Sequence, residues 1–246
     1  VRGSLALPQS AIEQITVMTS GLSAAYGDAT GGIISVTSKG PSNQLFGGAE
    51  VVTSQLFDDY NYNLLGFSLS GPIYKEIKED GSKGRAILGY FLAGEARSID
   101  DNNPSAVGIW KIKDESLLNL QNDLFRAVPN IQNSNVTLIN NSDYLRASDF
   151  ENVQAKPNAN QSGYRFSGKV DFKPTLKTNL TIGGSIDNSI DNIFSYTNSL
   201  VNSQNNVEDE SNTWRTYARF TQRFGAQEGD EESTSSIKNA YYTLSV

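Results

Sequence analysis

Basic side chains recur at every fourth position in two stretches of the chain, and no other residues have a clearer capacity to bind a ligand. In both stretches they alternate with apolar residues; in order, they are Arg165, Lys169, Arg215, Arg219 and Arg223. Guanidinium and ammonium groups bind carboxylates and phosphates through charge-assisted hydrogen bonds. The chemistry offered is therefore electrostatic: binding of an anionic ligand, or pairing with acids on neighbouring segments.

Residues for catalysis are scarce. The chain contains no cysteine and no histidine, which excludes disulfides, cysteine-based zinc sites and histidine-dependent nucleophilic machinery. Two acidic clusters, Asp100–Asn103 and Glu228–Glu232, offer oxygen ligands for Ca²⁺, but neither has the spacing of a calcium loop, so we expect solvated turns. No phosphate-binding loop is present either. We expect no enzymatic activity, no cofactor and no bound metal.

Composition narrows the class of partner. The formal net charge of −7 and the pI near 4.7 argue against nucleic acid, because phosphate binding relies on Lys and Arg. Mean hydropathy is −0.40, and no run of about 18 apolar residues marks a transmembrane helix. A membrane-spanning β-barrel escapes this test, because its strands alternate lipid-facing and lumen-facing residues.

Seven segments after residue 40 have the length and alternation of β-strands. They are Leu45–Phe57, Tyr60–Tyr74, Arg85–Arg97, Ser162–Lys173, Thr178–Ile190, Asn212–Phe224 and Ser236–Val246. A soluble β-sandwich alternates in the same way, so alternation leaves both a sandwich and a membrane barrel open. The connections favour a barrel: a tight turn at Pro174–Lys177 contrasts with long connections at Ile99–Gln161 and Asp191–Ser211, as in outer-membrane barrels.

The longest connection contains one helical pattern. A short amphipathic helix over Asp114–Val128 is predicted by apolar residues at helical spacing, followed by Pro129: Leu117, Leu120, Leu124 and Val128. We expect it to pack the loop against itself; a lid over a barrel mouth is the alternative. The flanking sequence is rich in Asn, Ser and Gln, so we expect polar loops there.

The stretch Ile15–Lys39 has a different character. Two β-branched runs flank a turn of small residues that contains Tyr26-Gly27 and Gly31-Gly32. Glycine permits positive φ and close backbone approach, so this pattern predicts two paired strands with a bend between them. On pattern alone, an ordinary strand-turn-strand unit of a globular domain explains the stretch equally well.

The run A-A-Y-G-D-A-T-G-G-I-I-S-V-T-S-K, which ends at Lys39, carries a family resemblance. Together with V-R-G-S at the start, it resembles the C-terminal part of the plug domain of TonB-dependent outer-membrane receptors, within their Oar-like, carboxypeptidase-regulatory-like branch. The resemblance implies an all-β chain in two parts. Residues 1–40 would be the C-terminal part of the plug. Residues 41–246 would be about seven antiparallel N-terminal strands, with their loops, of a large transmembrane β-barrel.

Three structural expectations follow from the resemblance. Ile15–Met18 pairs with Ile33–Thr37 in a small sheet inside the barrel, with Gly31-Gly32 at the bend. The five basic residues line the lumen, and the chain is a piece of a longer receptor, so that Ser236–Val246 pairs with a strand outside this sequence.

The resemblance also implies a function. Such receptors carry out TonB-dependent active import of a solute (a chelate, glycan or peptide) across the outer membrane of a Gram-negative bacterium, with the plug gating the barrel. The implied partners are outer-membrane lipid, a TonB-type energy-coupling protein, an unknown transported ligand and a surface lipoprotein; nucleic acid is not expected. One alternative is a non-transporting outer-membrane barrel acting as a structural or secretion-associated partner. Another is a soluble surface β-domain.

Overall fold

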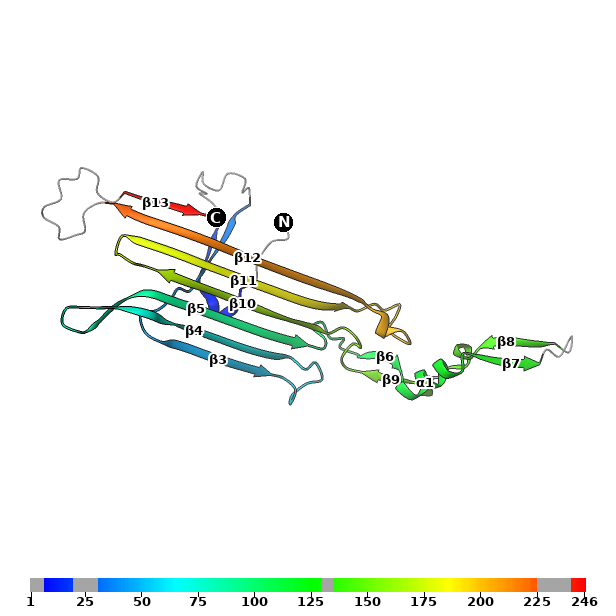
Figure 1. Ribbon diagram of the computed structural model, residues 1–246. Helices are drawn as coiled ribbons and strands as arrows, with labels where there is room; N and C mark the ends of the chain where they lie inside the picture. Colours follow the sequence, from blue (N-terminus) through cyan, green and yellow to red (C-terminus); the bar gives the residue numbers. More distant parts are fainter. Residues whose placement is uncertain (1–6, 20–30, 130–134, 225–239) are drawn as a thin grey trace.

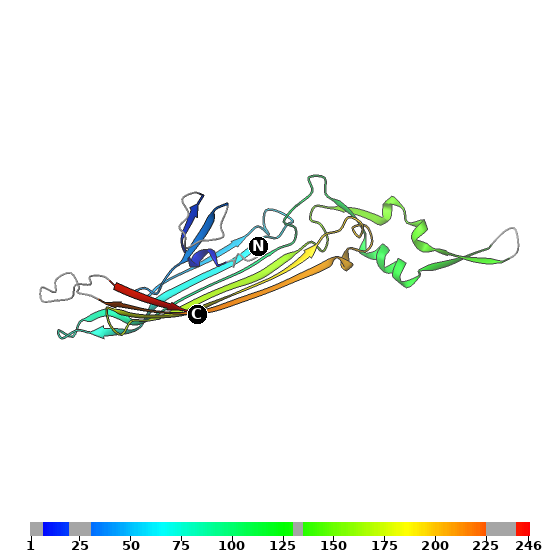
Figure 2. The same cartoon turned by 90° about the horizontal axis from the view of Figure 1, so that it is seen from above.

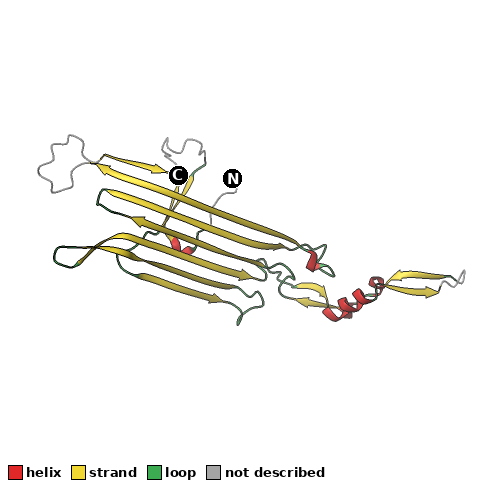
Figure 3. Ribbon diagram, in the orientation of Figure 1, coloured by secondary structure: helices red, strands yellow, loops and turns green. Residues whose placement is uncertain are grey.

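One large antiparallel sheet dominates the computed structural model, which describes residues 7–19, 31–129, 135–224 and 240–246 (Figure 1). Its seven strands follow the order β13-β12-β11-β10-β5-β4-β3. Their bounds are β3 Phe46–Thr53, β4 Asn63–Ile77, β5 Lys83–Ile99, β10 Gln161–Phe172, β11 Thr178–Ile193, β12 Val207–Phe224 and β13 Ala240–Ser245. The predicted all-β class is confirmed, and the large antiparallel sheet is consistent with part of a β-barrel (Figure 3).

The first and last residues of two of these strands differ from those predicted from the sequence. β12 begins at Val207 rather than Asn212, because Glu208, Asp209 and Glu210 pair with β11 instead of remaining in a polar loop. β4 starts three residues later than expected and continues to Ile77. Polar residues therefore extend β12 because the neighbouring strand supplies backbone hydrogen-bond partners. The alternation of residues within one segment does not reveal such a partner.

A second, two-stranded sheet stands on one face of the large one (Figure 2). β1 (Ile12–Met18) pairs antiparallel with β2 (Ile33–Ser38), so the predicted pairing is confirmed. Gly32 has φ +134°, and a Cβ there would lie 3.0 Å from the Met18 carbonyl oxygen, so glycine is required beside the end of β1. Tyr26 and Gly27, also predicted in this turn, lie outside the described residues.

A lobe extends from the end of the sheet where β5 finishes and β10 begins (Figure 1). It contains β6 (Ile109–Ile112) paired with β9 (Phe150–Val153), then α1 (Asp114–Asn122), and a hairpin of β7 (Phe125–Pro129) and β8 (Val136–Asn140). Short 3₁₀ turns complete the described chain: η1 Gln9–Ala11, η3 Asn141–Tyr144, η4 Ala147–Asp149 and η5 Ser203–Asn205. None of the described helices is long and apolar enough to cross a lipid bilayer.

The helix predicted over Asp114–Val128 is wrong in its second half. α1 ends at Asn122, and Val128 lies in β7, where it pairs with Thr137. Asp123 leaves the helical region with φ −137° and ψ 83°. The residues that follow include aromatic and β-branched side chains, which suit a strand once a partner strand is available. The four apolar residues at helical spacing therefore do not belong to one helix: Leu117 and Leu120 lie in α1, and Val128 lies in β7.

The two faces of the large sheet differ in chemistry. Cross-strand partners lie on the same face, and the register places Phe67, Phe166, Ile186 and Trp214 together on what we call the apolar face. These side chains are 39% to 69% exposed. The opposite, polar face carries the small sheet, and the described core cluster lies there: Ala11, Phe91 and Ala93. The sheet thus exposes its large apolar residues and has part of its polar side covered.

Candidate functional site on the polar face

The five predicted basic residues all lie on the polar face. The register aligns Arg165 with Asp187, Lys169 with Gly183, Arg215 with Ser185, Arg219 with Thr181 and Arg223 with Tyr241. The two-residue period of the strands therefore brings β10 and β12 residues to one side of the sheet. Whether this side is a barrel lumen remains a prediction.

Arg165 is held between two carboxylates on neighbouring strands. Its Nη1 lies 3.4 Å from Glu95 Oε1 on β5, and its Nε lies 3.2 Å from Asp187 Oδ2 on β11. All three side chains are at most 25% exposed. Arg165 therefore cross-links three strands, which matches the structural role that sequence left open, pairing with acids of neighbouring segments.

Lys169 reaches the small sheet instead. Its Nζ donates to the Ser38 carbonyl oxygen at 2.9 Å and to Ser38 Oγ at 3.3 Å. Ser38 is the last residue of β2. A second anchor follows in the connection to β3, where the backbone N–H of Ser42 donates to Ser70 Oγ at 2.8 Å, and Ser70 is 4% exposed. Both contacts fix the end of β2 over the polar face.

The start of β1 is anchored by the 3₁₀ turn η1. Ala11 is fully buried against the polar face beside Phe91 and Ala93. The Gln9 backbone N–H donates to Glu95 Oε2 at 3.1 Å. Glu95 therefore bonds both to the turn that holds β1 and to Arg165, so the small sheet is linked to the cross-strand ion pair.

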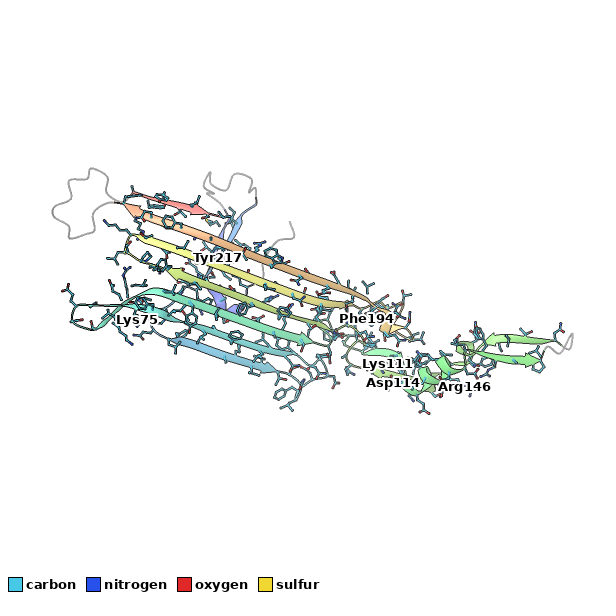
Figure 4. The ribbon with its side chains drawn as sticks, viewed as in Figure 1. Lys75, Lys111, Asp114, Arg146, Phe194 and Tyr217 are labelled. Carbon is cyan, nitrogen blue, oxygen red and sulfur yellow. The ribbon has the colours of Figure 1, made fainter. Side chains whose placement is uncertain are left out.

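The three arginines of β12 occupy different surroundings. Arg219 and Arg223 line a cavity of about 510 Å³ at the end of the sheet that carries the turn at residues 174–177. Arg215 lies farther along β12, beyond Tyr217, and does not line that cavity. Figure 4 marks Tyr217 partway along β12. The predicted basic residues therefore have different roles. Arg165 forms ion pairs across strands, Lys169 contacts the small sheet, and Arg219 and Arg223 line the cavity.

Sequence reasoning missed the partners of these basic residues. Glu95, Ser38 and Ser70 hold the small sheet in place. Ser38 lies in the run that carries the family resemblance, but nothing in that run marks its contact with Lys169, and Glu95 and Ser70 belong to no recognisable motif. Glu95 lies in the third predicted strand, whose alternation is irregular. No sequence signal singles these residues out, because their importance arises from contacts between distant segments.

The lobe has its own network of charges. Lys111 Nζ lies 3.1 Å from both Asp114 Oδ1 and Glu151 Oε1 (Figure 4). Partial burial opposes its charge, but the hydrogen bonds to Glu151 and Asp114 raise the pKa of Lys111. Asp149 accepts the Arg146 backbone N–H at 2.7 Å and Ser116 Oγ at 3.1 Å; these bonds lower its pKa. The network fixes α1 to η4.

The first acidic cluster is not the solvated turn that we expected. Asp101 is 2% exposed. Its Oδ1 accepts the Asn103 backbone N–H at 3.0 Å, and its Oδ2 accepts the Lys156 backbone N–H at 2.9 Å. Asp101 therefore joins the two ends of the lobe segment through buried hydrogen bonds. The second cluster, Glu228–Glu232, lies outside the described residues.

Comparison with known proteins gives one informative relative. Over 99 residues the chain is 36% identical to a protein described as a probable TonB-dependent siderophore receptor, PirA, of Acinetobacter baumannii. The match covers 39% of this chain and 12% of the relative. No protein-family model matches the chain, and no solved structure matches it. The similarity supports the TonB-dependent receptor family and an outer-membrane setting.

Proposed function

We propose that this chain forms part of a TonB-dependent importer of the outer membrane, with residues 1–40 as the C-terminal part of its plug and residues 41–246 as barrel wall. The observation that carries the proposal is the inverted polarity of the large sheet: its apolar face is exposed and its polar face binds the small sheet. Large apolar side chains such as Phe166, Ile182 and Trp214 are exposed, whereas the small sheet covers part of the polar face. A lipid-facing exterior and a polar interior have this arrangement.

Magnitudes favour lipid over water as the neighbour of the apolar face. Each Å² of apolar surface left in water forgoes about 25 cal/mol of stabilisation. Contiguous apolar patches on soluble monomers rarely exceed a few hundred Å². Here six of the seven strands contribute large exposed apolar residues, among them Val51, Leu65, Val170, Ile182, Trp214 and Leu244. A membrane removes this cost without any further protein layer.

The contacts of the small sheet suit a gate. It is held to the wall by a small patch around Ala11 and by hydrogen-bonded pairs that include Lys169 with Ser38, Gln9 with Glu95, Ser42 with Ser70 and Ser10 with Phe67. Hydrogen bonds contribute only about 0.5 to 1.5 kcal/mol each, or about 1.5 to 3 kcal/mol when one group is charged, because water replaces them. Pulling on the plug therefore breaks a few exchangeable contacts while the wall stays intact.

The finer assignments rest on family resemblance. The N-terminal run supports placement in the Oar-like, carboxypeptidase-regulatory-like branch. We propose a chelate, glycan or peptide as the imported solute and a TonB-type protein as the energy source. A surface lipoprotein is the further partner that the resemblance implies. Cell outer membrane of a Gram-negative bacterium is the proposed location.

Uptake by cells that express the full-length receptor tests the proposal. This chain has no cysteine, so Ser38→Cys and Lys169→Cys introduce its only pair for a short, cleavable cross-linker with two thiol-reactive groups, in a receptor whose cysteines outside this chain have been replaced. A ⁵⁵Fe-labelled siderophore is the first probe, followed by labelled glycans and peptides. We expect uptake to stop when the proton gradient is dissipated or the cross-link is present, and to return after cleavage. Each single-cysteine variant is the control.

Uptake that is unaffected by the cross-link would contradict gating by the small sheet. Failure of every probe to accumulate in an energised cell, with the receptor inserted in the outer membrane, would favour the non-transporting barrel.

A further inference from the structure

The polar face is hollowed at the end that carries the turn at residues 174–177, and cations dominate the lining. The cavity holds about 510 Å³, within the range of about 300 to 1,000 Å³ that is typical of ligand sites. Its charged lining residues are Arg85, Asp171, Lys173, Lys177, Arg219 and Arg223. Five cations therefore face one carboxylate.

Two of the five cations already have anionic partners. Lys173 Nζ lies 3.3 Å from Asp171 Oδ2, and Asp171 Oδ1 accepts the Thr181 hydroxyl at 2.7 Å, so both oxygens of this carboxylate are engaged. Arg85 Nε lies 3.1 Å from Glu76 Oε2 and its Nη2 donates to the Pro174 carbonyl oxygen at 3.1 Å. The cavity's own carboxylate therefore already has a cationic partner in Lys173.

Three cations remain. Within the part of the chain that the structure describes, no carboxylate forms an ion pair with Lys177, Arg219 or Arg223. The Arg223 backbone N–H donates to the Lys177 carbonyl oxygen at 2.8 Å, which places these two residues side by side. Arg219 lies on the same face of β12, about 13 Å along the strand from Arg223. Three long side chains thus border one cavity.

We propose that this cavity binds a small multivalent anion that carries carboxylate or phosphate groups. Cations that share one cavity repel each other, and a bound polyanion removes that repulsion while accepting their hydrogen bonds. Arginine is suited to the role because its planar group holds a carboxylate or phosphate through two parallel hydrogen bonds. The site lies at the end of the sheet opposite the lobe and does not depend on active import.

Citrate is the probe for the first test, with inorganic phosphate as a competitor. Calorimetric titration of the full-length receptor in detergent at low ionic strength should show citrate binding that weakens as salt is added. The double variant Arg219→Gln/Arg223→Gln should raise the Kd at least tenfold. Acetate, with a single charge, should bind at least tenfold more weakly than citrate.

Matched variants separate loss of charge from loss of fold. Arg97→Gln removes a cation near the opposite end of β5, outside the cavity lining, and should change the Kd less than twofold. Arg219→Lys/Arg223→Lys keeps the charge and should bind citrate clearly better than the glutamine pair. Citrate binding by the glutamine pair at the wild-type Kd would overturn the proposal, as would no binding to the wild type at millimolar citrate. A lysine pair as weak as the glutamine pair would also overturn it.

Discussion

Arg165 and Phe166 are neighbours in β10, yet they meet opposite surroundings. Arg165 is enclosed by two carboxylates from adjacent strands on the polar face. Phe166 is 39% exposed on the apolar face, with Phe67 as its aromatic neighbour at 6.4 Å between ring centroids. A soluble protein would cover the phenylalanine and expose the arginine.

The same contrast extends across the sheet. On the apolar face, contacts are sideways between strands, and no described layer of the chain covers Ile182 or Trp214. On the polar face, η1 and the end of β2 cover Ala93, Ser70 and Lys169. The difference teaches that one face leaves its large apolar side chains uncovered while the other binds a second sheet, which is the arrangement that the proposed lipid-facing exterior and polar interior require.

The strongest challenge to this contrast is a charge on the apolar face. Ile182→Arg should lower the free energy of unfolding in lipid by about 2 to 4 kcal/mol, because the side chain would lie near mid-bilayer. Thr213→Arg, an exposed position on the polar face of β12 beside Asp187, is the control and should change it by about 0.5 kcal/mol or less. Urea unfolding of the full-length receptor in bilayers measures both. Equal effects would contradict the assignment of faces.

Overpacking distinguishes the faces within a single strand. Ala93 is fully buried beneath η1, whereas Ala96 in the same strand is exposed on the apolar face. Ala93→Leu should destabilise the docked small sheet by about 1 to 3 kcal/mol. Ala96→Leu should be nearly neutral. Protease cleavage of residues 12–38 reports the loosening, and equal protection in both variants would show that Ala93 does not seat the small sheet.

Removing the cross-strand cation tests the interior of the polar face. Arg165→Met leaves Glu95 and Asp187 without their shared partner, so stability should fall by about 1 to 3 kcal/mol. Adding Glu95→Gln should recover part of the loss, because one uncompensated charge is then gone. A double-mutant cycle measures this coupling. A coupling energy near zero would mean that water already solvates the pair.

The sequence predicted the strands of the large sheet better than the short strands of the lobe. Alternation in Ser162–Lys173 predicted β10 almost to its ends, because a strand with two different faces displays both in its own residues. The four-residue strands β6 and β9 showed no such pattern and were missed. Strands that short are defined by their partner, which sequence periodicity does not encode.

The candidate site divides in the same way. A period of two placed the five basic residues on one face without any structure. Their partners are tertiary: Arg165 bonds Glu95 across 70 residues, and Lys169 bonds Ser38 across 131 residues. Contacts at that separation depend on the order of the strands and on how the small sheet docks. Local sequence patterns therefore do not predict them.

The smallest expected effect lies in the lobe, away from both faces. Hydrogen bonds from the Arg146 amide and Ser116 lower the pKa of Asp149, so the carboxylate's contribution is present above the unfolded pKa of about 3.9 and is lost as pH falls through the lower folded value. An NMR titration of the Asp149 carboxyl carbon should show a midpoint below 3.9. Ser116→Ala should move it upward. A midpoint at or above 3.9 would show that these bonds are absent in solution.

The most direct measurement asks which face meets lipid. Trp214 and Thr213 are adjacent and exposed on opposite faces of β12, and this chain has no cysteine. Once cysteines outside this chain have been replaced, Trp214→Cys and Thr213→Cys each accept a single spin label. In the full-length receptor in bilayers, we predict that the label at 214 collides mainly with oxygen dissolved in lipid. The label at 213 should collide mainly with a water-soluble nickel reagent. Water accessibility at both positions, or lipid contact at 213, would contradict the claim that the apolar face meets lipid and the polar face does not.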